Sequence, residues 1–563
     1  MPPLRVAFLV DDLKVSQYVY NLVDHVKNDS RFAAPILLME FRENKNNVSK
    51  FEKILSVFRD KGLVGFIETL IFHILYLLII RIELPKTRLA YPNYKTSKEL
   101  KGDVLQVHKF KGLWSKSKLF LRFPDDEIEK IRNLNLDVII RCGNGILKGE
   151  ILNSSKFGIL SFHHGDNRKN RGGPSGFWEV LNDEPSSGFV IQRLNEELGG
   201  GDVIFRGNIM TSNTWTTNNA ALLEKSNVFF MKILNNLADM RLLPKFEDVT
   251  LHHNKLYKID RNPIILLSYL NKILFPLIFK VVRERILGEE VQQWSIAFTR
   301  FDRFKKSLFR YVEINNPKSR FLADPFVFSH REKSVIFAED FFYSDNKGRI
   351  SAISIEDDNP RFLGIILEED FHLSYPFVFD DNGTIYMIPE TSKSKQIRLY
   401  RCEEFPLKWV FVKSLMDDVS AADTMVVKRN GYWFMLTNIC TANIGDHGSE
   451  LHIFYSKDLL SHDWLPIESG NPVIFDSLRA RNGGMFEIDG NIYRVNQVHG
   501  KAHYGKGFEI NKITELTTKQ YTEIKMDSIE PNFKKGAVST HHFNSDRKYS
   551  VVDFMRIVKR RNV

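Results

Sequence analysis

The hydrophobic pattern of the first 210 residues predicts an α/β fold with strands buried on both faces. Apolar runs at residues 4–10 and 137–141 are typical of parallel strands, and residues 17–26 have the spacing of a helix with one apolar side. We therefore expect a Rossmann-like domain. The first strand is not followed by a G-x-G-x-x-G loop, so an NAD(P)-dependent dehydrogenase is not expected.

Two segments, at residues 64–80 and 264–282, are much more hydrophobic than the rest of the chain. The first contains Glu68 and His73 and is slightly shorter than the roughly 20 apolar residues of a membrane span. Basic residues flank both segments. Three interpretations stay open, namely a helix packed within protein, a helix lying in a membrane interface, and a true span. Two such segments in one chain favour peripheral membrane contact.

From about residue 294 the hydrophobic pattern changes to the period of two that predicts β-strands. A pair of strands recurs five times at a spacing of about 47 to 60 residues, the range of four-stranded propeller blades. The first strands of the pairs lie at residues 323–328, 375–380, 422–428, 482–488 and 540–546. The expected domains are an α/β domain at 1–212 with an apolar helical insertion at about 60–90, a helical linker at 213–293 with an apolar helix at about 263–286, and a five-bladed β-propeller at 294–563.

Composition narrows the class of protein further. The 563 residues exceed what one hydrophobic core usually organises, in agreement with a multidomain α/β plus all-β chain. The net charge of +10 suits phosphates or an anionic membrane, but no helix-turn-helix, zinc-finger or RNP pattern points to nucleic acid. The three cysteines are far apart, which argues against disulfides, and no metal is expected. The N-terminus lacks the features of a signal peptide, so a cytoplasmic location is expected.

Residues 158–206 carry the densest candidate chemistry. A short apolar strand is followed by His163 and His164, a basic glycine-rich turn at Arg171 and Gly172, and a second glycine cluster. Polar side chains directly after a strand are where α/β enzymes place their chemistry. The alternative is a loop-rich crossover whose histidines cap or pack.

The expected propeller holds a second candidate site. Innermost propeller strands start beside the central channel, so residues at their N-terminal ends converge there. Those residues, together with Glu390 at the end of a second strand, are Asp324, Ser374, Tyr375, Asp423, Arg481, Asn482, His541 and His542. Carboxylates, an arginine and histidines around one channel form a polar pocket suited to a sugar or a glycosidic bond. The alternative is that each Asp starts a turn and satisfies backbone N–H groups.

The stretch that begins at residue 158 resembles the catalytic segment of the formyltransferases, the family of methionyl-tRNA, glycinamide ribonucleotide and sugar N-formyltransferases. The resemblance covers roughly residues 4–210. It implies a Rossmann-like fold and 10-formyltetrahydrofolate as co-substrate. The positions that match the family motifs are His163, Arg171-Gly172 and Ser187-Gly188, with Gly145, Ile146 and Leu147 at the loop beside the folate pterin.

Two positions depart from the formyltransferase pattern. The family's catalytic Asn falls on Ser161, and its Asp falls on Gly199. Formyl transfer needs a hydrogen-bond donor at the oxygen of the tetrahedral intermediate and a base for the amine proton. Ser161 still offers one hydrogen bond. The carboxylate has to come from elsewhere, and the nearby candidates in the sequence are Asp166, Glu197 and Asp202, with His164 as an additional base.

The C-terminal part resembles the five-bladed propeller in the N-terminal region of plant glucosamine inositolphosphorylceramide transferases, over about residues 319–554. The matching phrases include ADPFVF, HLSYPFVFDDNGTIYMIPE and ARNGGMFEIDGNIYRVNQ. By similarity to five-bladed glycosidases, Asp324 takes the position of the base, Asp423 that of the modulator and Glu390 that of the acid. Arg481 and Asn482 stand where a later blade usually supplies the acid, so hydrolysis is not expected.

Together these features predict formyl transfer from 10-formyltetrahydrofolate to the amine of an amino sugar in surface-glycan biosynthesis. His163 would polarise the formyl oxygen with help from Ser161, and Asp202 or His164 would receive the amine proton. The propeller would hold a lipid-linked or nucleotide-linked glycan, and the expected location is the inner face of the plasma membrane. The alternative is a glycan-binding or glycosyl-transferring propeller protein with a catalytically degenerate formyltransferase fold.

Overall fold

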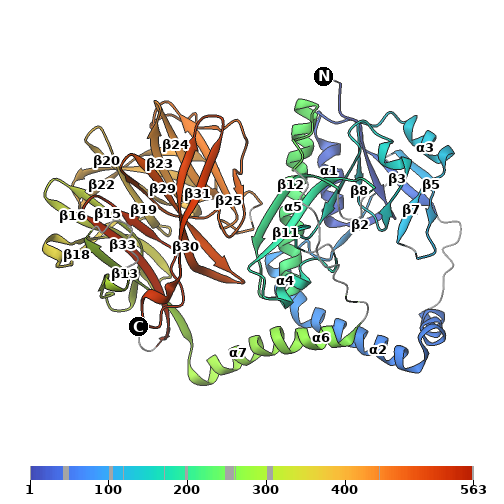
Figure 1. The fold of residues 1–563 in the computed structure, drawn as a ribbon, viewed down its shortest axis with the longest axis horizontal. Helices are drawn as coiled ribbons and strands as arrows, with labels where there is room; N and C mark the ends of the chain where they lie inside the picture. The colour runs from blue at the N-terminus through green and yellow to red at the C-terminus, as the bar shows by residue number, and fades with distance from the viewer. Residues whose placement is uncertain are drawn as a thin grey trace. The chain divides into compact units, whose positions relative to one another are not determined.

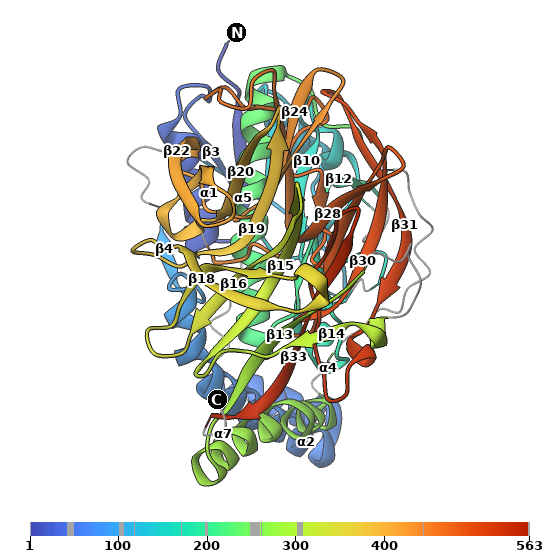
Figure 2. The same cartoon turned by 90° about the vertical axis from the view of Figure 1, so that its left-hand side faces the viewer.

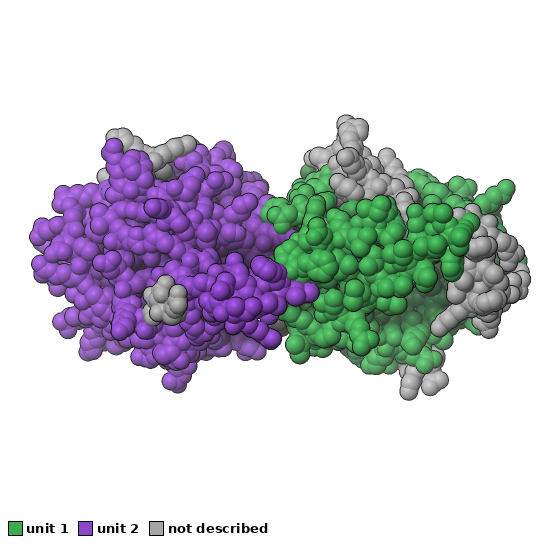
Figure 3. Space-filling view, turned by 90° about the horizontal axis from the view of Figure 1, so that it is seen from below, with its two compact units in different colours: residues 1–276 green, residues 277–563 purple. Residues whose placement is uncertain are grey.

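The chain divides into two compact units, unit 1 (Met1–Pro276) and unit 2 (Leu277–Val563), coloured separately in Figure 3. The structure is a computed structural model. It describes residues 2–41, 50–100, 106–117, 119–169, 172–196, 201–247, 259, 262–300, 308–442 and 444–560, with backbone only at 41 and 50–61.

Unit 1 is built on a seven-stranded sheet in the order β12-β11-β10-β8-β1-β3-β5. The five strands from β10 to β5 are parallel, whereas β11 and β12 are antiparallel to their neighbours. The central strands are the apolar runs of the sequence, and β1 and β8 are buried along their whole length. The strands are β1 (Val6–Val10), β3 (Ile36–Phe41), β5 (Gln106–Lys111), β8 (Val138–Arg141), β10 (Ile159–His163), β11 (Ser186–Arg193) and β12 (Asp202–Met210).

Helices and two small sheets complete unit 1. The helices are α1 (Gln17–Asn28), α2 (Lys50–Ala90), α3 (Asp125–Arg132), α4 (Phe177–Leu181), α5 (Trp215–Met240) and α6 (Pro263–Tyr269). The small sheets pair β2 (Lys14–Ser16) with β4 (Ser97–Glu99), and join β6 (Leu113–Trp114), β7 (Phe120–Arg122) and β9 (Ile146–Leu147). The sequence places α5 in a linker, but the structure differs, because α5 packs against β11 and buries Leu222, Phe230 and Leu234.

The first apolar segment and the start of the second form helices, α2 and α6, that lie side by side in unit 1 (Figure 1). In α2 the backbone leaves the helical conformation at Gly62, where φ is 67°, and Gly62–Ala90 then forms one apolar helix. A π-helical turn (Leu270–Leu274) connects α6 to α7 (Phe275–Leu287), and α2 also packs against α5. The first turn of α5 is held by these neighbours, since Trp215 N donates to the Tyr269 hydroxyl and Thr216 N donates to Glu83.

Unit 2 consists of five antiparallel sheets that follow one another around a common centre (Figure 2). Their innermost strands are β15, β19, β23, β28 and β32, and each contacts the next in a closed ring. The chain therefore forms a five-bladed propeller, as the sequence repeat predicts. The first blade is β15 (Arg320–His330), β16 (Lys333–Phe342), β17 (Lys347–Ser354) and β18 (Arg361–Leu367). The second blade is β19 (Ser374–Asp381), β20 (Thr384–Glu390), β21 (Gln396–Glu404) and β22 (Lys408–Asp417). The third blade is β23 (Ala421–Arg429), β24 (Tyr432–Ile439), β25 (Glu450–Ser456), β26 (Leu465–Pro466) and β27 (Ile474–Phe475).

The last blade is assembled from two distant parts of the chain. The fourth blade is β28 (Asn482–Ile488), β29 (Asn491–Gly500), β30 (His503–Leu516) and β31 (Tyr521–Ile529). In the fifth blade, β32 (Phe543–Ser545) and β33 (Tyr549–Lys559) pair with β13 (Glu290–Arg300) and β14 (Val312–Ile314). The eleven-residue ladder between β13 and β33 closes the ring.

The innermost strands of the fourth and fifth blades approach so closely that Gly484 accepts no side chain. A Cβ there would lie 2.0 Å from the Phe543 carbonyl oxygen, at a φ of 129°. We expect Gly484→Ala to lower the free energy of unfolding of unit 2 by about 3 kcal/mol. Gly490→Ala is the matched control, since its Cβ would meet no described atom within 4 Å. Equal losses in urea unfolding of the two variants would contradict this assignment.

Candidate functional site

One backbone irregularity recurs at the start of the innermost propeller strands. Asp324, Tyr375 and Asp423 have φ values of 49°, 48° and 49°, and each lies where its strand slips in register against the next strand. Such bulges re-aim a side chain, and residues with a Cβ adopt this conformation only when the surrounding structure enforces it. Three successive blades therefore direct a polar side chain toward the centre.

Arg481 holds two carboxylates at this centre. Its Nε donates to Asp423 Oδ2 at 2.7 Å, and its Nη2 lies 3.6 Å from Glu390 Oε2. Gln497 Nε2 also donates to Asp423 Oδ2, at 3.1 Å. The guanidinium lies 5.2 Å from the ring centre of Tyr504, a cation–π contact. The structure thus brings together Glu390, Asp423 and Arg481, which the sequence assigns to three different blades.

His541 lies between two further carboxylates. Its Nε2 is 3.1 Å from Asp324 Oδ1, and its Nδ1 is 2.6 Å from Asp553 Oδ2. Burial favours the neutral imidazole, but the two carboxylates prevail and raise the pKa of His541 to about 10. The imidazolium in turn holds the pKa of Asp324 below its ordinary value, against the effect of burial. Asp324, His541 and Asp553 also offer ligand atoms within 4.8 Å of one another.

The carboxyl groups of this centre differ in charge state. Burial, together with the nearby charges of Asp324 and Glu390, raises the pKa of Glu339 well above its ordinary value. Burial likewise raises the pKa of Asp423 to about 7, although Arg481 opposes it. Asp324 stays ionised. Two groups whose surroundings push their pKa values apart are suited to act as a general acid and a general base.

We call Asp324, Glu339, Glu390, Asp423, Arg481, His541 and Asp553 the central cluster. Asp324, Asp423 and His541 are buried, whereas Glu390 and Arg481 are partly exposed. Tyr504 and His372 are partly exposed as well, with His372 Nε2 3.4 Å from Glu339 Oε1. Glu390, Arg481 and Tyr504 lie together and are partly exposed, and we call them the open side of the central cluster. Tyr375 lies deeper, fully buried, with its hydroxyl donating to Met425 Sδ and its ring 5.2 Å from that of His542.

The sequence analysis does not single out Glu339 or Asp553. A signal for both is present in the repeat, because the second strand of every blade carries a polar residue at the same place. In each blade this residue lies opposite the start of the innermost strand. The five residues are Glu339, Glu390, Asn438, Asn496 and Asp553.

In unit 1, the predicted catalytic residues lie at the end of β10. Ser161 Oγ donates to the neighbouring Phe162 carbonyl at 3.3 Å. His164 Nε2 contacts Ser226 Oγ of α5 at 2.9 Å, and burial together with His163 lowers the pKa of His164 to about 4. A histidine with so low a pKa stays neutral. His163 shares the strand, opposite Val190 of β11.

The acidic candidates of unit 1 are held by arginines. Asp202 lies on β12, and its Oδ2 accepts from Arg193 Nε and Nη2 at 2.9 and 2.6 Å. On β11, Arg193 pairs with Asp202, whereas Val190 pairs with His163. Asp202 and His163 therefore lie opposite residues of β11 that are three positions apart. The carboxylate of Asp166 accepts from Arg168 and Arg206.

The other predicted residues of unit 1 are dispersed. Ser187 is buried and contacts Thr211 Oγ1 at 2.9 Å, and Asn218 Nδ2 donates to its hydroxyl at 2.8 Å. Ile146 and Leu147 form β9, and a Cβ at Gly145 would clash with Trp114. Gly172 lies in the turn before α4. Arg171, Glu197 and Gly199 lie outside the described residues.

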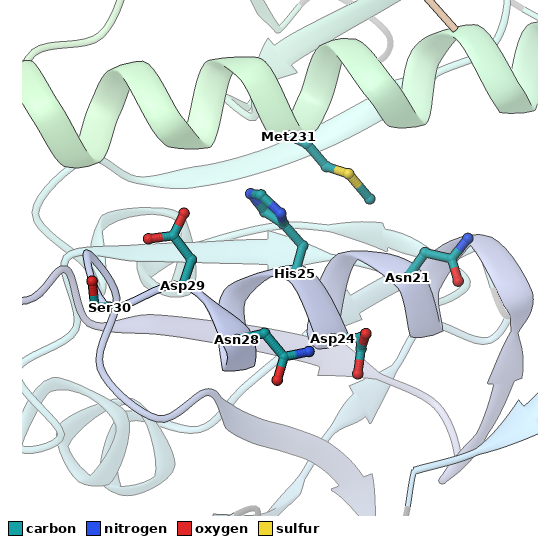
Figure 4. Close-up of a pocket in the computed structure, with 7 residues that line it drawn as sticks. All are labelled: Asn21, Asp24, His25, Asn28, Asp29, Ser30 and Met231. Atoms are coloured by element: carbon teal, nitrogen blue, oxygen red, sulfur yellow. The ribbon is translucent and has the colours of Figure 1, made fainter. Parts of the chain in front are cut away.

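A surface depression in unit 1 offers mostly polar side chains of α1 and the turn after it (Figure 4). There His25 of α1 points toward α5, and its Nε2 lies 2.8 Å from Asn235 Oδ1. The depression is lined by Asn21, Asp24, His25, Asn28, Asp29, Ser30 and Met231. Its groups are not those of the central cluster, and it holds no residue that the sequence singles out.

The fold and this centre define an α/β unit followed by a five-bladed propeller with a buried cluster of carboxylates, an arginine and a histidine. Residues 310–559, the greater part of the propeller, match the family "Glucosamine inositolphosphorylceramide transferase 1, N-terminal". The chain is 34% identical over 241 residues to glucosamine inositolphosphorylceramide transferase 1 of Oryza sativa subsp. japonica, covering 41% of this chain and 32% of the relative. The same enzyme of Arabidopsis thaliana is 35% identical over 236 residues, 40% of this chain and 30% of the relative. The chain thus spans about a third of the length of these curated relatives.

Among solved structures, the catalytic domain of the Coprinopsis cinerea GH62 α-L-arabinofuranosidase is similar at 10% identity and a TM-score of 0.33. It covers 46% of this chain and 97% of that domain. So low a score carries no argument about function.

These comparisons overturn the prediction of folate-dependent formyl transfer. Similarity to formyltransferases is short, for example 33% identity over 98 residues to methionyl-tRNA formyltransferase of Clostridium beijerinckii, covering 17% of this chain and 32% of the relative. The long matches are to glucosamine inositolphosphorylceramide transferases. The geometry agrees, since Ser161 replaces the amide of the family and Asp202 is bound to Arg193. The prediction was wrong, and the alternative of a propeller protein with glycan-related function is better supported.

Proposed function

We propose that unit 2 is a glycan-binding propeller that serves glycosyl transfer. The observation that carries this proposal is the open side of the central cluster, where Glu390, Arg481 and Tyr504 lie together above buried carboxylates. A carboxylate and a guanidinium supply acceptors and donors for sugar hydroxyls, and an aromatic ring supplies a flat apolar face. The match of residues 310–559 to a transferase family supports the same conclusion.

The charge of the central cluster favours an amino sugar as the bound unit. Five carboxyl groups, those of Asp324, Glu339, Glu390, Asp423 and Asp553, face one guanidinium and one imidazolium. Even with Glu339 protonated, negative charge predominates, and a protonated amine is attracted. The relatives are named for glucosamine, which carries such an amine.

A second candidate function is glycosyl transfer by the central cluster itself. The feature that favours it is the opposite shift of two pKa values, since burial raises the pKa of Glu339 well above its ordinary value and His541 lowers that of Asp324. Transfer of a glycosyl group needs an acid that protonates the leaving oxygen and a base that takes the proton of the acceptor hydroxyl. Glu339 would act as the acid and Asp324 as the base.

Glycan binding is tested by titrating the full chain with glucosamine, N-acetylglucosamine and oligosaccharides that end in either sugar. We expect Glu390→Gln to weaken binding of the free amine about 10- to 100-fold, because a charge-assisted hydrogen bond contributes about 1.5–3 kcal/mol. Isothermal calorimetry measures the change.

Glu368→Gln is the matched control, because Glu368 is an exposed carboxylate paired with Lys347 and Arg349 outside the central cluster. It should bind like the parent. Equal affinity of the Glu390→Gln variant and the parent, or no binding of any of these sugars, would refute the proposal. If binding survives in Glu339→Gln while turnover of a glycosyl donor is lost, the second candidate function is supported as well.

A further inference from the structure

The exposed face of α2 is apolar over about 30 Å, counted from residue 63 to residue 82 at 1.5 Å per residue. The residues that form it recur every three or four positions and stand 40% or more exposed, with Val64 at 71% and Ile74 at 57%. We call this set the outer face; it consists of Leu63, Val64, Ile67, Leu70, Ile71, Ile74, Leu78 and Ile82. Contiguous apolar surface of this length is uncommon on soluble proteins and marks an interaction site.

The opposite face of α2 is buried and is the more polar of the two. Thr69, Glu83 and Thr87 are buried, and the Tyr269 hydroxyl and the Thr216 N–H donate to the Glu83 carboxylate at 2.6 and 2.9 Å. Thr87 Oγ1 lies 2.7 Å from Thr216 Oγ1. A helix on the surface of a soluble protein has the reverse arrangement, with its apolar side inward. The sequence of α2 is therefore suited to surroundings less polar than water on its outer side.

The helix α6 lies beside α2 and also exposes apolar side chains. In α6, Leu266 and Tyr269 are buried against unit 1, whereas Ile264 and Leu267 are 70% and 49% exposed. In α7 no residue is buried, and its apolar side chains include Phe279 and Ile286. Among the described residues, Gly62–Ala90 and Pro263–Leu287 are the helices long and apolar enough to cross a membrane, yet only 11% and 28% of their most hydrophobic stretches are buried.

The charges on α2 complement an anionic surface. Within Gly62–Ala90, whose side chains the structure describes, Arg81, Lys86 and Arg88 are exposed toward the C-terminus, against one exposed acid, Glu68. A helix with an apolar face and basic residues binds the boundary between headgroups and acyl chains, and anionic lipids strengthen that binding. These features identify a lipid surface, since a protein partner would not require basic residues beside so long an apolar face.

We propose that α2 and α6 lie flat in the interface of an anionic lipid bilayer, with the outer face of α2 inserted among the acyl chains. The hydrogen bonds of Glu83 and Thr87 fix the C-terminal half of α2 to α5 and α6. A span over residues 63–82 would carry the carboxylate of Glu68 into hydrocarbon, which is costly. An interfacial α2 leaves Glu68 near the headgroups and keeps the hydrogen bonds of Glu83 and Thr87. Attachment through α2 is independent of glycan binding by unit 2.

Flotation of the full chain with vesicles tests the proposal. We expect the parent to float with phosphatidylcholine–phosphatidylglycerol vesicles and much less with phosphatidylcholine alone. The variant Leu70→Glu/Ile74→Glu/Leu78→Glu should bind about tenfold more weakly or worse, because it places three charges in the acyl region. Arg81→Gln/Lys86→Gln should lose the preference for anionic vesicles. The bound parent should be released by alkaline carbonate.

Ile524→Glu is the matched control, since Ile524 on β31 is 58% exposed, close to the 57% of Ile74, but lies on the propeller. It should float like the parent, and circular dichroism should show all variants folded. Three outcomes would overturn the proposal. The first is flotation of the triple variant equal to that of the parent. The second is resistance of the parent to carbonate, which indicates a span. The third is a parent that binds no vesicle but forms an oligomer that the triple variant does not form. That result indicates that a second copy of the chain covers the outer face.

Discussion

Replacing Arg481 by Met lowers the free energy of unfolding of unit 2 by about 3–5 kcal/mol at pH 8, because the buried carboxylate of Asp423 loses its partner. Asp423 is 2% exposed and receives two hydrogen bonds from Arg481, so water does not replace the guanidinium. Urea unfolding followed by hydrogen-exchange mass spectrometry of β23 and β28 measures the loss separately from unit 1.

The loss depends on pH in a defined direction. Burial raises the pKa of Asp423 to about 7, and without Arg481 that pKa rises further. A carboxyl group with a raised pKa is protonated without penalty below its unfolded value, and the penalty grows as pH rises through the folded value. The variant should therefore be closer to the parent at pH 5 than at pH 8. Asp423→Asn combined with Arg481→Met should recover part of the loss. Equal losses at both pH values would show that Arg481 acts through packing alone.

Replacing His541 by Gln should lower the stability of unit 2 by an amount on the order of 4 kcal/mol at pH 6 and much less near pH 10. The pKa of His541 is raised to about 10 by Asp553 and Asp324, from an ordinary value of 6.5. Stability from such a group is fully present below the unfolded pKa and is lost as pH rises through the folded one. The parent should therefore lose stability between about pH 6.5 and pH 10, and the variant should not.

Thermal unfolding across this pH range, compared with that of His372→Gln, provides the check. His372 borders the same cluster, but burial lowers its pKa to about 4, so it stays neutral and should add no such dependence. A parent curve that is flat between pH 6.5 and pH 10 would show that His541 is not an imidazolium in the folded state.

Periodicity in the sequence predicts the elements of both units but not how the ring is closed. The first two strands of the four complete blades follow from the repeat, because each is an apolar alternation bounded by turns. The contribution of β13 and β14 to the last blade does not follow, since residues 290–314 show no local sign of pairing with residues 549–559. Likewise α5 has an apolar face that a linker does not need, and packing on β11 decides its place.

The candidate site of unit 2 could be predicted from the sequence better than that of unit 1, again because the pairing of distant strands decides which side chains meet. The positions of Asp324, Glu390, Asp423, Arg481 and His541 within their repeats predict that they lie at one centre. This prediction is possible because the blades form a closed ring, so that the same part of each repeat lies beside the central channel. Glu339 and Asp553 occupy an equally regular position, but their pKa and partners depend on neighbours in other blades. In unit 1, short motifs do not specify register. Asp202 is close to His163 in the sequence, yet its strand pairing places it beside Arg193.

Because the last blade is built from two distant parts of the chain, its strands are synthesised at different times. The outer strands β13 and β14 leave the ribosome before the other four blades, and their partners β32 and β33 follow more than 200 residues later. Throughout that interval β13 presents an unpaired edge, and the innermost strands cannot complete their circle. The central cluster itself is assembled only when His541 and Asp553 arrive. A chain that ends before residue 540 therefore leaves an exposed strand edge, which favours aggregation.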